Sequence, residues 1–157
     1  MKLRAKARFA RLWIMLLFTC LSMVTVSVVA SAVQIGDEYD NDHRYLGGIV
    51  FYVDGTGKHG LVAAKSDIQN GMTWIDAELA CENLVSNGYS DWFLPNKEQL
   101  RAMYNMCSAV GCFVDDGYWS STEYSATTFA WFQGFGNGYQ GVGYENVEWR
   151  VRPVWVF

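Results

Sequence analysis

The order of apolar and polar residues predicts a hairpin followed by two helices. Apolar runs at 48–53 and 60–64 lie on either side of a glycine-containing turn, which predicts an antiparallel hairpin. A helix is predicted over 74–85, because its apolar residues recur at helical spacing while acidic residues occupy the other face. A second helix is predicted to begin at Asn96, where Asn96 and Gln99 form the pattern of a capping box. The inner faces of the two helices are expected to be Trp74, Ala77, Cys81 and Leu84, then Leu100, Met103, Tyr104 and Cys107.

Beyond these helices the chain has the pattern of strands and turns. Strand-like segments occupy 118–122 and 129–133, and the glycines of 134–143 are expected to prevent regular structure there. Residues 148–157 alternate between two faces, which predicts a closing strand. A hairpin, two helices and several strands in this order predict an α+β fold, in which the C-terminal strand is free to return to the first hairpin.

The first 32 residues have the organisation of a secretory signal peptide. Five basic residues precede an uncharged apolar run at 12–29, and the run is followed by Ala30-Ser31-Ala32. We predict cleavage after Ala32, and a retained membrane anchor is the alternative because the run is about long enough to span a bilayer. Residues 33–157 are then predicted to be a single exported domain in the periplasm, outside the cell or on its surface, without a membrane segment.

Removal of the signal segment leaves a strongly acidic chain. Five of the 12 basic residues and none of the 16 acidic ones lie in that segment, so 7 basic and 16 acidic residues remain and the net charge is −9. Such a charge without a basic cluster excludes nucleic acid as a partner. Arg150 and Arg152 are expected to pair with acids such as Glu123 and to support the fold.

Three cysteines remain outside the signal segment, and export permits disulfides. Cys107 and Cys112 are separated by a short loop, and we predict a disulfide between them. Cys81 is then expected to be a buried thiol on the first helix. A catalytic Cys81 would need a base, and both histidines are distant in the sequence.

Several blocks of the sequence, in this order, resemble one bacterial family. They are Gly47-Gly48-Ile49-Val50-Phe51-Tyr52-Val53, His59-Gly60-Leu61-Val62-Ala63-Ala64, Trp74 through Cys81, Asp91-Trp92-Phe93-Leu94-Pro95-Asn96-Lys97-Glu98-Gln99-Leu100, Tyr118-Trp119-Ser120-Ser121-Thr122-Glu123-Tyr124, Ala130-Trp131 and Val151-Arg152-Pro153-Val154. The family is named for the C-terminal domain of a bacterial collagen-like adhesin, the Lcl C-terminal domain. The resemblance covers about residues 34–157.

The resemblance implies a C-type-lectin-like fold, related to formylglycine-generating enzymes and phage receptor-binding modules. The name-giving domain is associated with sulfated polysaccharides, but Phe93 replaces an arginine usual in the family, and a charge of −9 disfavours polyanions. The family ligand is therefore not carried over. Formylglycine-type chemistry needs a cysteine pair near the C-terminus, and no cysteine follows Cys112.

No metal or cofactor is expected. Leu94-Pro95-Asn96 lacks the acid that a calcium-dependent sugar site of this fold places before the proline. A second option is that the acids of the leader share a hard cation such as Ca²⁺, although such leaders are usually solvated. These acids are Asp37, Glu38, Asp40 and Asp42.

The aromatic and amide residues between 124 and 146 are the candidate ligand-binding site, because rigid rings and adaptable amides are typical of recognition surfaces. The candidates are Tyr124, Trp131, Gln133, Asn137, Tyr139, Gln140, Tyr144 and Asn146, of which Tyr139, Gln140 and Tyr144 are expected to be the main contacts. No catalytic residue is assigned. The predicted function is a non-catalytic exported module that binds a glycan or a surface protein. The alternatives are a display protein diversified by a retroelement and a cryptic enzyme, and the oligomeric state stays open.

Overall fold

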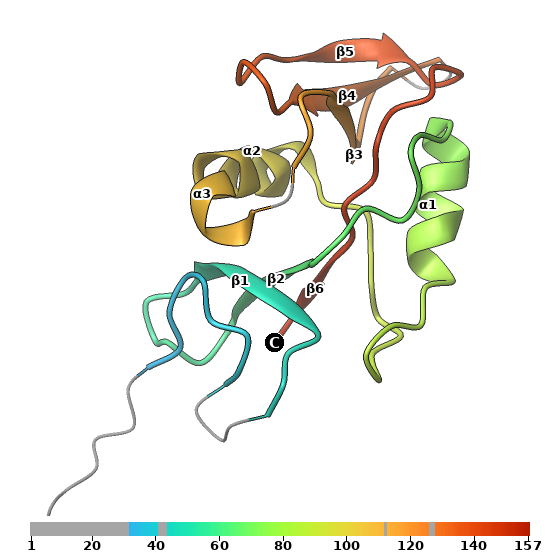
Figure 1. Ribbon diagram of the computed structural model, residues 1–157. Helices are drawn as coiled ribbons and strands as arrows, with labels where there is room; N and C mark the ends of the chain where they lie inside the picture. The colour runs from blue at the N-terminus through green and yellow to red at the C-terminus, as the bar shows by residue number, and fades with distance from the viewer. Residues whose placement is uncertain (1–31, 41–43, 112, 126–127) are drawn as a thin grey trace, which may run out of the picture.

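Two small antiparallel sheets form the ends of the molecule in the computed structural model, which describes residues 32–40, 44–111, 113–125 and 128–157. The sheets have the strand orders β1-β2-β6 and β3-β4-β5, and the helices lie between them (Figure 1). This arrangement confirms the predicted α+β class. The elements are β1 (Gly48–Val53), β2 (Gly60–Ala64), α1 (Trp74–Glu82), α2 (Lys97–Asn105), α3 (Cys107–Val110), β3 (Gly117–Ser125), β4 (Phe129–Gly134), β5 (Gln140–Tyr144) and β6 (Val154–Val156).

The first sheet contains the predicted hairpin and the predicted return of the C-terminal strand. β1 pairs with β2, and β2 pairs with β6 with Val62 opposite Trp155. The terminal strand is shorter than the expected 148–157, because Trp149 and Arg150 form isolated bridges to Met72 and to the second sheet. The chain therefore crosses from one sheet to the other before β6 begins.

Both predicted helices form, but their C-terminal ends differ from the prediction. The side chain of Thr73 caps α1, which ends at Glu82, three residues earlier than predicted. The capping box of α2 is confirmed, since the Asn96 side chain accepts from the Gln99 amide at 2.8 Å and the Gln99 side chain accepts from the Asn96 amide at 2.8 Å. Cys107 lies in the separate short helix α3 rather than in α2.

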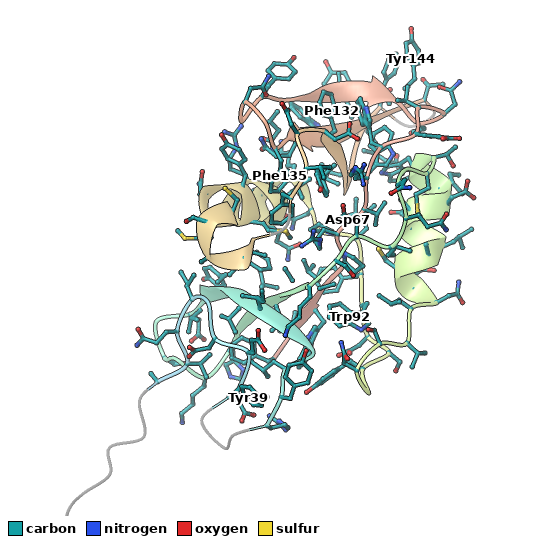
Figure 2. All side chains as sticks on the ribbon, in the orientation of Figure 1. Tyr39, Asp67, Trp92, Phe132, Phe135 and Tyr144 are labelled. Carbon is teal, nitrogen blue, oxygen red and sulfur yellow. The ribbon has the colours of Figure 1, made fainter. Side chains whose placement is uncertain are left out.

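The second sheet separates two apolar clusters, because neighbouring residues of β3 point to opposite faces. Tyr118 packs with α2, α3 and Phe135, whereas Trp119 packs with the buried face of α1. A third cluster, around Trp92 and Trp155, lies at the other end, over the first sheet. Figure 2 shows that side chains fill the space between the helices and the sheets.

A buried ion pair joins the two halves of the molecule. Arg152 is only 1% exposed, and its Nε donates to Asp67 at 2.7 Å. The hydroxyl of Tyr118 donates to the same carboxylate at 3.0 Å, and burial raises the pKa of Tyr118 to about 12. Arg150 forms ion pairs with Asp67 and Asp116. The arginines thus pair with acids as predicted, but the partners are these aspartates and not Glu123.

The expectation that glycines prevent regular structure over 134–143 is wrong for its second half. Gly141 and Gly143 belong to strand β5, on the face that meets aromatic rings. A Cβ at Gly143 would lie 2.2 Å from the ring of Trp149, and one at Gly141 would lie 2.5 Å from the ring of Tyr139. Glycine is required here because rings pack directly on the strand, not because the backbone is irregular.

Within the described residues, no helix is both long enough and apolar enough to span a membrane. The predicted signal peptide covers 1–32, and 1–31 lie outside the described part. The leader that follows is not simply solvated. Val33 is buried in the cluster of Trp92 and Trp155, and the amide of Gly36 donates to the Val50 carbonyl at 2.8 Å.

Candidate functional site

The face of the second sheet that points away from α1 carries a group of exposed and half-buried apolar side chains. Strand register places Phe129 opposite Tyr144 and Trp131 opposite Val142, and all four side chains share this face. Tyr124 joins them, with its ring centroid 5.9 Å from that of Trp131. We call this group the aromatic face, consisting of Tyr124, Phe129, Trp131, Val142 and Tyr144.

The aromatic face contains two ring pairs supported by the strands of the second sheet. Tyr124 meets Trp131 edge-on, and Phe129 lies against Tyr144 with 4.4 Å between ring centroids. Tyr124 is 61% exposed and Tyr144 59%, although both belong to strands. Figure 2 shows Tyr144 pointing into solvent at the outer end of the sheet. Exposed rings on a sheet are costly in water unless a partner covers them.

A lysine borders this face and is held in place by the backbone of α2. The ammonium of Lys97 lies 4.5 Å from the ring centroid of Trp131, within cation–π distance. The Lys97 amide donates to Thr122 Oγ1 at 3.0 Å, and its carbonyl accepts from Gln140 Nε2 at 2.8 Å. The first residue of α2 is therefore fixed to β3 and β5, which positions the cation beside the rings.

The aromatic face is also free of charge within its own segment of chain. No Asp, Glu, Lys or Arg occurs from 124 to 144, in a molecule whose residues 33–157 carry a net charge of −9. The surface therefore offers ring faces and tyrosine hydroxyls rather than carboxylates. Such a surface suits an uncharged ligand.

The structure brings together only three of the eight predicted contacts on the aromatic face, namely Tyr124, Trp131 and Tyr144. Gln140 lies at its edge, where its amide is used to hold Lys97. Tyr139 is on the opposite face of the sheet, where its ring meets Phe132 at 5.9 Å. The expectation that Tyr139 and Tyr144 act from one surface is therefore wrong.

The other amide candidates have local structural roles or lie outside this face. Gln133 is completely buried, and its Nε2 donates to the carbonyls of Gly134 and Tyr139, so the structure removes it from any ligand surface. The side chain of Asn137 accepts from the Tyr139 amide at 2.9 Å and closes a turn. Asn146 is exposed in the turn after β5.

Sequence reasoning missed Phe129, Val142 and Lys97. The first two lie on strands, and only the pairing of β4 with β5 shows that they point the same way as Trp131. Alternation along 129–133 could have joined Phe129 to Trp131. Lys97 carried no such signal, because its position depends on how α2 meets the sheet.

Two acids of the leader form ion pairs. Glu38 pairs with Lys65 and Asp40 with Arg44, while Asp42 lies outside the described residues. No group of three or more potential metal ligands occurs among the residues that the structure describes. Burial raises the pKa of Glu78, and three neighbouring carboxylates raise it further: Glu82, Glu123 and Glu145.

We expect a thiol reagent at pH 8 to leave Cys81 unmodified in the folded protein. Cys81 is buried on α1, and burial raises its pKa to about 12, so the reactive thiolate is scarce. Cys107 is half-buried and is not disulfide-bonded within the described residues, and Cys112 lies outside them, so the disulfide between the two stays a prediction.

Mass spectrometry after alkylation, with and without prior unfolding and reduction, checks both statements. With the disulfide, native protein gains no label, and unfolded but unreduced protein gains one outside residues 1–32. Rapid labelling of Cys81 in the native state would contradict the burial argument.

The fold and the site together define an α+β domain that carries exposed rings on a small antiparallel sheet. The Lcl C-terminal domain family matches residues 57–155 of the 157. The chain belongs to the Lcl C-terminal domain family, and the resemblance seen in the sequence is confirmed. This family is not known as a family of enzymes, and membership indicates an adhesin-like or surface domain. No curated protein matches the chain significantly.

Proposed function

We propose that this protein is an exported, non-catalytic recognition module that binds an uncharged oligosaccharide on the aromatic face. The observation that carries the proposal is the two ring pairs, Tyr124 with Trp131 and Phe129 with Tyr144, on one face of a sheet, each pairing an exposed tyrosine with a half-buried ring. Ring faces stack on the apolar faces of sugars, and two neighbouring ring pairs suit successive sugar units. Hydroxyls of Tyr124 and Tyr144 supply polar contacts at the rim.

The position of the aromatic face supports display away from a cell surface. The described chain begins near the first sheet, where Val33 packs beside Trp155, and the C-terminus lies at the same end (Figure 1). The aromatic face lies on the second sheet, at the other end. An attachment before residue 32 would therefore leave the rings pointing outward.

We also propose that the fold is C-type-lectin-like. The pairing of β6 with the first hairpin, together with a separate small sheet beyond the helices, supports this assignment. An experimental structure that superposes on C-type lectins over both sheets would test it. A different connection of the two sheets would contradict it.

Replacement of Trp131 or Tyr144 by alanine is expected to weaken oligosaccharide binding about tenfold each, because each substitution removes one stacking surface. An array of neutral and sulfated glycans identifies the probe, and NMR titration with the neutral oligosaccharide that binds best gives the dissociation constant. Tyr139→Ala is the matched control, since Tyr139 is 62% exposed but lies on the opposite face of the same sheet.

If Tyr139→Ala weakens oligosaccharide binding as much as Tyr144→Ala does, the site assignment is contradicted. Unchanged binding by folded Trp131→Ala would contradict it as well. Binding to sulfated glycans alone would contradict the uncharged ligand. If no glycan binds while a surface protein does, and that binding depends on Trp131, the face is a protein-binding site instead.

A further inference from the structure

Strand β5 is an open edge of the second sheet. It ends the strand order β3-β4-β5, and no other strand of the described residues pairs with its outer side. Figure 1 shows β5 at the periphery of the molecule. An edge strand exposes backbone N–H and C=O groups that can pair with another chain.

The hydrogen-bond phase identifies which groups of β5 point outward. The Gly134 amide donates to the Tyr139 carbonyl at 2.7 Å, and the Glu145 amide donates to the Thr128 carbonyl at 3.0 Å. Bonded and non-bonded pairs alternate along an antiparallel ladder, so the backbone groups of Gly141 and Gly143 face β4. The N–H and C=O of Val142, between them, point away from the sheet.

The edge lacks the features by which proteins usually prevent strand pairing. β5 has the sequence Gln-Gly-Val-Gly-Tyr, with no charge, no proline and no bulge in its pairing with β4. Charged side chains, prolines and bulges are the usual protection of an exposed edge. In an acidic molecule, this uncharged segment is also a place where two copies can meet without opposing carboxylates.

We propose that two copies of this chain pair through β5, antiparallel, with the two-fold axis at Val142. The sequence is symmetric at the positions next to that residue, since Gly141 and Gly143 flank it. The Val142 N–H of each copy would donate to the Val142 carbonyl of the other, and Gln140 would lie opposite Tyr144 of the second copy. The interface is isologous and closes as a dimer.

The two faces of the joined sheet are compatible with this register. On one face Gly141 lies opposite Gly143 of the second copy, so no Cβ obstructs the approach. There the Tyr139 ring, which lies on Gly141, would face the Trp149 ring, which lies on Gly143, of the other copy. On the other face Val142 meets its symmetry mate, and the two aromatic faces become one surface. The proposal does not depend on what that surface binds.

Sedimentation equilibrium of the protein expressed from its full coding sequence, without ligand, tests the pairing. We expect a monomer–dimer equilibrium with a dissociation constant of about 100 µM or tighter, as for a small interface. Val142→Pro removes the outward N–H without removing a bond to β4, and should weaken the dimer at least about tenfold. Val142→Lys retains the amide but opposes two charges at the axis, and should do the same. Val142→Thr retains both the shape and the amide, and should pair as the wild type does.

A wild-type mass that stays monomeric up to about 1 mM, ten times the expected constant, would overturn the proposal. So would a dimer that persists in both Val142→Pro and Val142→Lys, or an assembly larger than a dimer. Circular dichroism verifies that the variants are folded. If Val142→Pro does not fold, the dimer dissociation constant of Val142→Lys alone tests the pairing. Glycan binding by a monomeric wild type would leave the proposed function intact while this pairing fails.

Discussion

Replacement of Arg152 by methionine is expected to lower the free energy of unfolding by about 3–5 kcal/mol, because it removes the closer of the two cations that pair with the Asp67 carboxylate and leaves only Arg150, at 3.7 Å. Arg152 donates to Asp67 at 2.7 Å and to the Ala64 carbonyl at 3.1 Å. Its guanidinium also lies 4.3 Å from the ring centroid of Phe113. The substitution therefore removes charge pairing, a backbone contact and a cation–π contact together.

Urea unfolding followed by tryptophan fluorescence measures this loss. Arg44→Met is the matched control, because Arg44 also pairs with an aspartate at 2.7 Å but its side chain is 71% exposed. Its loss should be about 0–1 kcal/mol. The double variant Arg152→Met with Asp67→Asn should lose less than the sum of the single variants. Additive losses, or similar losses at Arg152 and Arg44, would contradict a buried pair.

Gly48→Ala is expected to cost about 3 kcal/mol, because the added Cβ meets backbone that cannot yield. A Cβ at Gly48 would lie 2.1 Å from the Ala63 carbonyl oxygen and 2.7 Å from the Val62 side chain. The hairpin must separate locally to admit it, and β2 also carries β6. Such overpacking against a strand is at the upper end of the usual cost.

Gly55→Ala is the control for this substitution. Gly55 lies in the turn of the same hairpin, and nothing lies within 4 Å of a Cβ there. The free energy of unfolding of Gly55→Ala, measured by urea unfolding, should stay within about 0.5 kcal/mol of the wild-type value. A Gly48→Ala protein as stable as Gly55→Ala would mean that the strands do not approach as closely as described.

The elements with local signals could be predicted, and the tertiary contacts between them could not. The capping box at Asn96 and Gln99 depends on residues three positions apart, so sequence alone identified it. Arg152 pairs with an aspartate 85 positions away, and no local pattern distinguishes that acid from Glu123. Gly143 belongs to a strand because it pairs with Ala130 of β4, a tertiary contact that local propensity cannot reveal.

The candidate site was predicted at the level of the segment rather than the surface. Residue types between 124 and 146 indicated where rings and amides gather, and Tyr124, Trp131 and Tyr144 do share a face. Side chains of a strand alternate between two faces, and this alternation is not considered when the segment is treated as a loop. For that reason the prediction placed Tyr139 and Tyr144 on one surface and included the buried Gln133.

The pairing of β6 with β2 has a consequence for how the molecule is made. Leu61 pairs with Val156, 95 positions later, so the first sheet stays incomplete until β6 has been synthesised. Until then Val62 and Ala63 lack one neighbouring strand, and the cluster around Trp92 lacks Trp155. Contacts so distant in sequence form slowly, because the chain must close a long loop first. A growing chain would therefore complete the first sheet only after β6 had emerged.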